Sequence, residues 1–195
     1  MVDDAPNTDI PRDRRQLFRY GLGRILSPLA DYLQERFPAP EPRLVLRPPG
    51  ALEESEFVRT CYKCGTCQNV CPAHAIRRVV SDDPDMENTP YIDPDLGACI
   101  VCENLECTKA CPSGALQKLT SRNEIRMGLA KVDFGVCLRS LGETCTTCVD
   151  RCPLGEAALK IDPQSRVEVQ DGCVGCGVCQ NVCPTNPRAI TVEPR

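Results

Sequence analysis

The sequence predicts an α+β fold built from four small repeated units. Its 16 cysteines among 195 residues fall into four groups of four, and every group ends in Cys-Pro. An apolar pair follows each group, and short strand-like runs such as residues 131–134 and 166–169 lie between groups, which favours short strands and helices. Aromatic residues make up only 4% of the chain, so apolar side chains alone would form a thin core.

The first and fourth cysteine groups share one regular spacing, C-x₂-C-x₂-C-x₃-C-P. The cysteines are Cys61, Cys64, Cys67 and Cys71 in the first group, and Cys173, Cys176, Cys179 and Cys183 in the fourth. This is the bacterial ferredoxin spacing, which binds [4Fe–4S] clusters. Three cysteines within seven residues converge on one object only if the backbone curls around it, and Gly65 and Gly177 stand where a positive φ would help.

The second and third groups keep the ending x₃-Cys-Pro but contain extra residues. Their cysteines are Cys99, Cys102, Cys107 and Cys111, and Cys137, Cys145, Cys148 and Cys152. The insertions lengthen a loop between ligands and leave the number of ligands unchanged. We therefore expect all sixteen cysteines to ligate four [4Fe–4S] clusters.

Other uses of the cysteines explain the pattern less well. A disulfide scaffold requires only an even number of cysteines, and residues so close in sequence are poor disulfide partners. A structural zinc protein remains an alternative, although zinc sites favour C-x₂-C pairs separated by longer gaps. With His74 as the single histidine and no phosphate-binding motif, we expect no catalytic site on this chain, which would act as an electron-transfer protein or as a subunit of an oxidoreductase.

Charge and hydropathy limit the partners. The formal net charge is −4, which argues against nucleic acid as a partner. No run of apolar residues reaches the length of a transmembrane segment.

The first fifty residues contain no cysteine and predict two segments ahead of a cluster domain at 51–195. Residues 1–37 include an apolar stripe at helical spacing, flanked by arginines, which predicts an amphipathic helix at 14–37. That helix would dock on a partner or a membrane surface, or pack on the cluster domain. Five prolines within twelve residues predict an extended linker at 38–50.

Residues 44–195 resemble the ferredoxin-type proteins associated with periplasmic nitrate reductase and methylamine dehydrogenase, the NapG/MauM family. The resemblance is carried by residues 46–52 (LRPPGAL), 107–116 (CTKACPSGAL) and 126–130 (RMGLA), together with the wide third motif. It implies ferredoxin-like units holding four clusters. It also implies a relay of electrons between redox partners, from a quinol-oxidising membrane protein to a reductase. An assembly factor for a partner redox enzyme is the alternative function.

The N-terminus also resembles part of the family pattern. Family members are typically exported by the twin-arginine route, and Arg14-Arg15 followed by Leu17-Phe18 resembles that signal. The next stretch contains Arg24 and Asp31 and no clear cleavage site. We expect a retained helix and a cytoplasmic or membrane-peripheral location, with the periplasm as the alternative.

The motifs should work in pairs, because the fourth cysteine of each ferredoxin motif ligates the other cluster of a pair. Motifs one and four are nearly identical, whereas motifs two and three both carry insertions, so similar halves predict a nested pairing of one with four and two with three. The resemblance implies the same order. Shorter loops favour sequential pairing by only about 0.6 kcal/mol per doubling of length. The expected ligand sets are Cys61, Cys64, Cys67 with Cys183; Cys173, Cys176, Cys179 with Cys71; Cys99, Cys102, Cys107 with Cys152; and Cys137, Cys145, Cys148 with Cys111.

Overall fold

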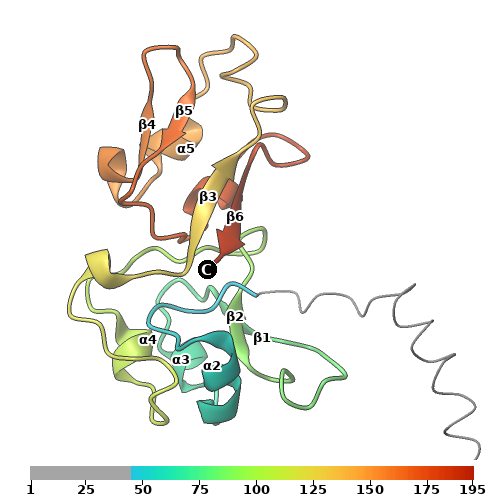
Figure 1. The fold of residues 1–195 in the computed structure, drawn as a ribbon, viewed down its shortest axis with the longest axis vertical. Coiled ribbons are helices and arrows are strands. Elements are labelled where there is room, and N and C mark those ends of the chain that lie inside the picture. Colours follow the sequence, from blue (N-terminus) through green and yellow to red (C-terminus); the bar gives the residue numbers. More distant parts are fainter. Residues whose placement is uncertain (1–44) are drawn as a thin grey trace, which may run out of the picture. The chain divides into compact units, whose positions relative to one another are not determined.

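The computed structural model describes residues 45–195 and contains short helices and short strands (Figure 1). The helices are α2 (Glu54–Thr60), α3 (Thr66–Asn69), α4 (Glu106–Lys109), α5 (Thr147–Asp150) and α6 (Val178–Val182), with 3₁₀ turns η1 (Arg122–Glu124) and η2 (Gly155–Ala157). The strands are β1 (Ile76–Arg78), β2 (Pro90–Ile92), β3 (Gly128–Val132), β4 (Leu159–Ile161), β5 (Val167–Val169) and β6 (Ile190–Pro194). This mixture confirms the α+β class.

Two of the predicted segments fall wholly or largely outside the described residues. These are the N-terminal segment 1–37, with its helix at 14–37, and most of the linker 38–50. None of the helices in residues 45–195 has the length and apolar character needed to span a bilayer.

The strands divide the described chain into two halves, which we call the first half (46–125) and the second half (126–195). The first half contains the antiparallel pair β1–β2, and the second half contains the pairs β3–β6 and β4–β5. Isolated bridges join Leu46 to Ile92 and Ala51 to Leu116 within the first half. In residues 45–195 every paired strand therefore has its partner in its own half.

The apolar pair after each Cys-Pro is a repeated structural element. All four pairs are buried: Ala75-Ile76, Ala115-Leu116, Ala158-Leu159 and Ala189-Ile190. Ile76, Leu159 and Ile190 each begin a strand. The repeat read in the sequence thus places a buried apolar residue at the start of a strand directly after the cysteines in three of the four units.

The core is thin, as the shortage of aromatic residues predicts. It consists of two clusters of buried residues, one in each half for the most part, and cysteines belong to both clusters. Phe57 is fully buried in the first cluster, whereas Phe134 is 47% exposed. Aliphatic residues and cysteines therefore supply most of the packing in the described chain.

The folded part begins earlier than residue 51, the predicted boundary. The backbone N–H of Ile92 donates to the carbonyl of Leu46 at 2.8 Å, and that of Gln117 donates to the carbonyl of Gly50 at 2.7 Å. Pro48 and Pro49 between them are fully buried. Proline is excluded from regular helices and central strands, but this segment pairs only at single positions, so residues 46–50 pack as part of the domain.

Arg47 anchors this segment in the first half. Its side chain is buried, and its guanidinium donates to both carboxylate oxygens of Glu54, at 2.5 and 2.9 Å. It also donates to the carbonyl of Pro90 at 2.7 Å and lies 4.6 Å from the ring centroid of Phe57. A buried guanidinium requires such partners, because an unpaired charge in the interior is costly.

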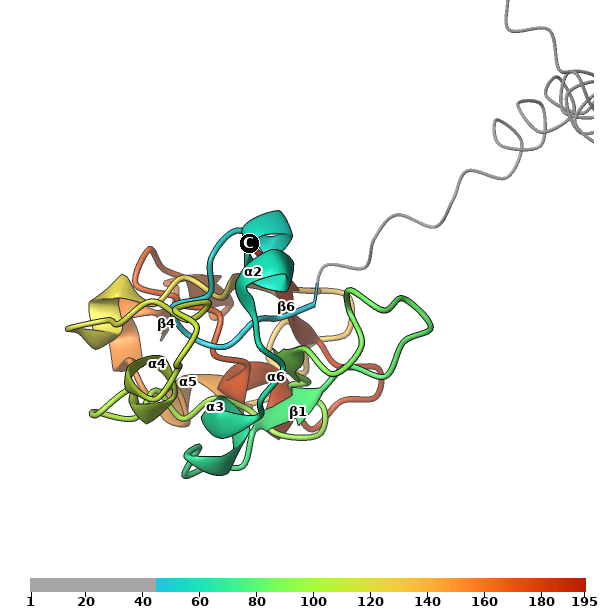
Figure 2. The same cartoon turned by 90° about the horizontal axis from the view of Figure 1, so that it is seen from below.

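The two halves meet at the loop that carries the fourth motif. The backbone N–H of Cys99 donates to the carbonyl of Cys176 at 3.0 Å, and the side-chain amide of Asn181 in α6 donates to the carbonyl of Pro94 at 2.7 Å. Figure 2 shows α6, the helix that carries Asn181, in a view from below. The same loop is also packed within the second half, where Gly175 has φ +71° and a Cβ there would overlap the backbone of Gly128. Glycine at 175 therefore permits the close approach of this loop to the start of β3.

The contact of Arg47 with Glu54 gives the first testable prediction. Glu54→Ala leaves the buried guanidinium without its carboxylate and should lower the free energy of unfolding by about 2–3 kcal/mol. Glu56→Ala removes an exposed acid from the same first turn of α2 and should cost under about 1 kcal/mol. Anaerobic chemical denaturation followed by circular dichroism measures both, and equal losses would contradict the anchoring role of Arg47.

Candidate metal centres

Four cavities in the structure are each lined by four cysteines. We call them site A (Cys61, Cys64, Cys67, Cys111), site B (Cys71, Cys99, Cys102, Cys107), site C (Cys152, Cys173, Cys176, Cys179) and site D (Cys137, Cys145, Cys148, Cys183). Each holds about 300 to 380 Å³ that no protein atom fills, solvent at its mouth included. In residues 45–195 no three His, Cys, Asp or Glu side chains are arranged around a single metal position. The thiols therefore surround a space rather than a point.

These groupings show that the nested pairing predicted from the sequence is wrong. Cys71 lies with the second motif and Cys111 with the first, so motifs one and two share sites A and B. Cys152 lies with the fourth motif and Cys183 with the third, so motifs three and four share sites C and D. Pairing is thus sequential.

The physical reason is that similar sequences give motifs one and four similar loop conformations. This similarity does not determine which other motif each of them pairs with. The cysteine that crosses to the neighbouring site is followed by proline in all four motifs, so unlike motifs exchange it equally well. The strands decide which motifs meet: β3, just before motif three, pairs along its length with β6, just after motif four. In the first half, the bridge from Ala51 to Leu116 closes the chain around motifs one and two.

The backbone of three motifs curls through left-handed residues at the start of a short helix. Gly65 and Gly177 have φ of 76° and 86°, which confirms the positive φ expected at these positions. In the second motif the same place before the helix is taken by Leu105, with φ of 45°, and the preceding loop also contains Val101 at 53°. Because neither residue is glycine, these turns could not be predicted from residue type.

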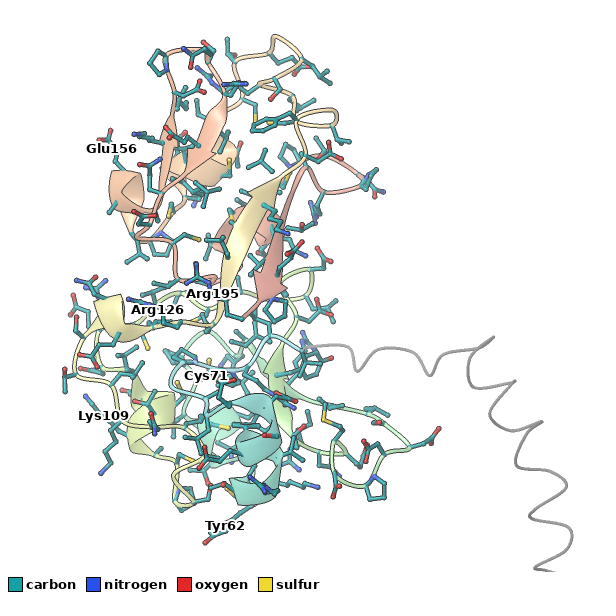
Figure 3. All side chains as sticks on the ribbon, viewed as in Figure 1. Tyr62, Cys71, Lys109, Arg126, Glu156 and Arg195 are labelled. Carbon is teal, nitrogen blue, oxygen red and sulfur yellow. The ribbon has the colours of Figure 1, made fainter. Side chains whose placement is uncertain are left out.

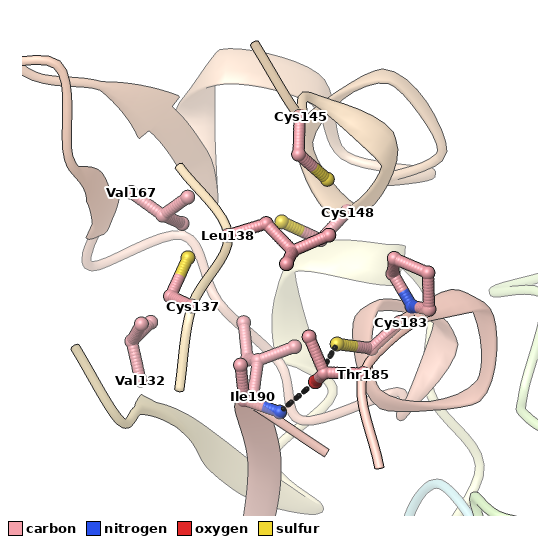
Figure 4. Close-up of a pocket in the computed structure, with 11 residues that line it drawn as sticks. Val132, Cys137, Leu138, Cys145, Cys148, Val167, Cys183, Thr185 and Ile190 are labelled. Carbon is pink, nitrogen blue, oxygen red and sulfur yellow. Dashed lines mark hydrogen bonds between the residues drawn. The ribbon is translucent and has the colours of Figure 1, made fainter. Parts of the chain in front are cut away.

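The wide third motif still delivers four cysteines to a site. Its insertion folds back through backbone bonds from Leu141 to the carbonyl of Cys137 at 3.1 Å and from Glu143 to the carbonyl of Leu138 at 3.0 Å. Figure 4 shows Cys137 and Cys145 on either side of Leu138 in site D. The longer loop therefore changes the path of the chain and leaves the number of thiols at four, as expected.

Apolar side chains line the sites and raise the pKa of the more deeply buried thiols. Val132, Val167 and Ile190 line site D (Figure 4). Burial raises the pKa of Cys67 to about 11 and that of Cys148 to about 11. Such thiols keep their protons at neutral pH unless a cation holds them as thiolates. A set of four thiolates suits a soft, strongly bound metal group.

Neighbouring sites in each half are close enough to influence one another. Burial raises the pKa of Cys107 in site B to about 12, and the thiol of Cys67 in site A adds to the shift. Burial likewise raises the pKa of Cys179 in site C, with a contribution from Cys148 in site D. The chain path agrees, because residues only four apart line the two sites of each pair: Cys67 and Cys71 in sites A and B, and Cys148 and Cys152 in sites D and C. Site A therefore adjoins site B, and site C adjoins site D.

Sites B and C meet where the two halves touch. The backbone N–H of Cys99 in site B donates to the carbonyl of Cys176 in site C at 3.0 Å. Burial raises the pKa of Cys99 to about 12, and the thiol of Cys176 adds to that shift. The sites thus follow one another in the order A, B, C, D. Figure 3 places Tyr62, beside site A, at the outer edge of the first half and Cys71 of site B well inside it.

Comparison with protein families identifies the metal group. A family model described as 4Fe-4S dicluster domain matches residues 60–115. These residues hold motifs one and two, the pair that the structure brings together. A second family model, described as 4Fe-4S binding domain, matches residues 167–188, which hold motif four. The thiol donor sets and apolar walls described above fit this group, so the chain contains [4Fe–4S]-binding domains.

Curated relatives cover most of the chain. It is 34% identical to the methylamine utilization ferredoxin-type protein MauM of Methylobacillus flagellatus, over 94% of this chain and 84% of that protein. It is 34% identical to MauM of Paracoccus denitrificans, over 82% of this chain and 76% of that protein. It is 35% identical to the ferredoxin-type protein NapG of Escherichia coli, over 76% of this chain and 70% of that protein. The chain therefore belongs to the MauM/NapG family of ferredoxin-type iron–sulfur proteins, whose chemistry is electron transfer.

Proposed function

We propose that this protein relays single electrons through four [4Fe–4S] clusters, one in each of sites A to D. The observation that carries the proposal is the unbroken row of four four-cysteine cavities, in which each site adjoins the next. A bound [4Fe–4S] cluster supplies reversible one-electron chemistry. A relay through the whole chain needs every site to have a neighbour, and the row provides this.

The residues of this chain would hold and tune the clusters. Sites A to D supply four thiolates each, with three from one motif and the fourth from its partner motif. Backbone N–H groups of Lys63 and Leu116 donate to the sulfurs of Cys61 and Cys111, both at 3.4 Å, and so stabilise negative charge in site A. A structural zinc site, the alternative, would draw four thiols toward one ion, whereas these thiols surround a space.

The row has two outer sites and two inner ones. In site A, Cys64 is exposed and the neighbouring Tyr62 is 72% exposed. In site C, Cys173, Cys176 and Cys179 are buried. Sites A and D, at the ends of the row, would exchange electrons with other proteins, and sites B and C would connect them.

The partners would be redox proteins. The relatives are described as ferredoxin-type proteins, and the MauM relatives are named for methylamine utilization. We therefore propose a donor such as a membrane quinol dehydrogenase and an acceptor reductase. The segment 14–37 would dock on such a partner or on the membrane surface. The protein would then be cytoplasmic or membrane-peripheral, or periplasmic if exported.

Metal content tests the number of clusters. Anaerobically purified protein should contain about sixteen iron and sixteen acid-labile sulfide atoms, four of each per cluster. Removing them should unfold residues 55–195, because the thin core cannot hold the fold alone. Iron and sulfide assays with circular dichroism give the result, and protein that contains zinc without sulfide would refute the proposal.

Paired cysteine variants test the assignment of ligands to sites. Cys71→Ala and Cys99→Ala remove ligands from the same site B, so the double variant should lose no more iron than either single variant, at most about four atoms. The control pair Cys71→Ala with Cys173→Ala affects sites B and C and should lose about twice as much. The reverse ranking of the two doubles would restore the nested arrangement.

Truncation tests the docking role of the N-terminal segment. A protein lacking residues 1–40 should keep its iron and sulfide, because every proposed ligand lies beyond residue 60. It should lose co-purification with its partner or its association with membranes. A truncated protein that fractionates like the full chain and keeps its partners would rule out docking. A natural N-terminus cleaved near residue 40 would show export instead.

A further inference from the structure

Four hydroxyl side chains contact cysteine sulfurs, and all four belong to the outer sites. In site A, Thr66 lies 3.3 Å from the sulfur of Cys64 and Ser113 lies 3.5 Å from that of Cys111. In site D, Thr147 lies 3.7 Å from the sulfur of Cys145 and Thr185 lies 3.2 Å from that of Cys183. Each hydroxyl comes two residues after the cysteine that it contacts.

The inner sites have no hydroxyl at the equivalent positions. Two residues after their second and fourth cysteines stand Asn104 and Ala73 in site B, and Val178 and Leu154 in site C. Within residues 45–195, no side-chain hydroxyl bonds a thiol of site B or C. The chain thus places two hydroxyls in each outer site and none in each inner site.

The direction of two of these contacts is set by the backbone. The N–H of Ala189 donates to the hydroxyl oxygen of Thr185 at 2.8 Å, which Figure 4 shows beside the contact with Cys183. The N–H of Ala115 donates to the hydroxyl oxygen of Ser113 at 3.3 Å. With this lone pair in use, the hydroxyl proton is free to donate to sulfur, and a thiolate bound to iron can only accept.

Hydrogen bonds to cluster sulfurs and exposure to solvent both set reduction potentials. Reduction adds one electron to a cluster that is already surrounded by four thiolates. A donor hydrogen bond stabilises the added negative charge, and burial away from water destabilises it. Exposure acts in the same direction as the hydroxyls at site A, where Cys64 is exposed, and at site C, where three cysteines are buried. It does not do so at site D, where Cys137 and Cys183 are buried, so the order of the potentials rests on the hydroxyls.

We propose that Thr66, Ser113, Thr147 and Thr185 hold the clusters of sites A and D at higher reduction potentials than those of sites B and C. This inference rests on the proposed four-cluster relay. In the step concerned, an oxidised cluster takes one electron from its neighbour and the hydroxyl keeps its proton. An electron then rests at either end of the row and crosses the middle by an uphill hop, so the partners bound at the two ends determine the direction of flow.

A redox titration of the full-length holoprotein, followed by EPR, tests the profile. With dithionite as the reductant, two clusters should reduce at higher potential and two at lower potential. Thr147→Val with Thr185→Val removes both hydroxyls from site D and should lower one of the upper potentials. The expected change is about tenfold in the reduction equilibrium, which is 59 mV for one electron.

Motifs one and four provide a matched exchange. Thr66 and Val178 each begin the helix that carries the third cysteine of their motif and follow Gly65 and Gly177. Thr66→Val should lower one upper potential, and Val178→Thr should raise one lower potential. The two side chains have nearly the same shape, so a purely structural role predicts no such opposite shifts.

Iron and sulfide analysis of each variant distinguishes the role of the hydroxyls from the proposed four-cluster relay. Variants that retain all four clusters with unchanged potentials would overturn the role of the hydroxyls and leave the relay standing. A wild-type titration in which two of the four clusters do not stand above the others would do the same. Wild-type protein without four clusters would overturn the proposed function itself.

Discussion

The structure depends on one constraint, the convergence of four thiols from two separate segments on each of four spaces. A motif alone delivers three thiols, and the fourth must come from a second motif that is folded against it. This exchange of the fourth cysteine joins motifs into pairs, and each pair makes one half of the described chain. The short strands and the buried apolar pairs help to meet this constraint, because they hold the two motifs of each pair against one another.

The two halves are joined through cluster-binding loops rather than through a shared sheet. The carbonyl of Cys176 in the fourth motif accepts from the backbone N–H of Cys99 in the second motif, so a contact between the halves is also a contact between sites B and C. Within the second half, the same loop lies close to the start of β3, where Gly175 is small enough to lie against Gly128. In the described residues this junction joins the halves through hydrogen bonds of loops and α6, without a shared strand pair.

The chemistry of the sites could be predicted from the sequence, because cysteine spacing is a local property. All sixteen cysteines lie in the four cavities, and the left-handed turns at Gly65 and Gly177 follow from glycine. The pairing of motifs could not be predicted in the same way. It depends on strand contacts such as β3 with β6. The loop-closure preference for near neighbours is small, and the similarity of motifs one and four is only local.

The packing of residues 46–50 and the left-handed turns of the second motif also depend on tertiary contacts, so residue type alone does not predict them. The prolines at 48 and 49 suggested a linker, but the segment is held by the side chain of Arg47, and proline does not interfere with that contact. Val101 and Leu105 take left-handed conformations that their residue types disfavour, so only the surrounding fold accounts for them. The hydroxyls beside the outer thiols were visible in the sequence, but their distribution has a meaning only once the sites are ordered in space.

The central claim is that four clusters lie in the row A, B, C, D with sequential exchange of ligands. Anomalous diffraction at the iron absorption edge, from crystals grown without oxygen, tests it most directly. The account predicts four iron peaks in that order, with the sulfur of Cys71 on the cluster held by Cys99, Cys102 and Cys107. A map with the sulfur of Cys71 on the cluster of Cys173, Cys176 and Cys179, or with fewer than four iron sites, would contradict it.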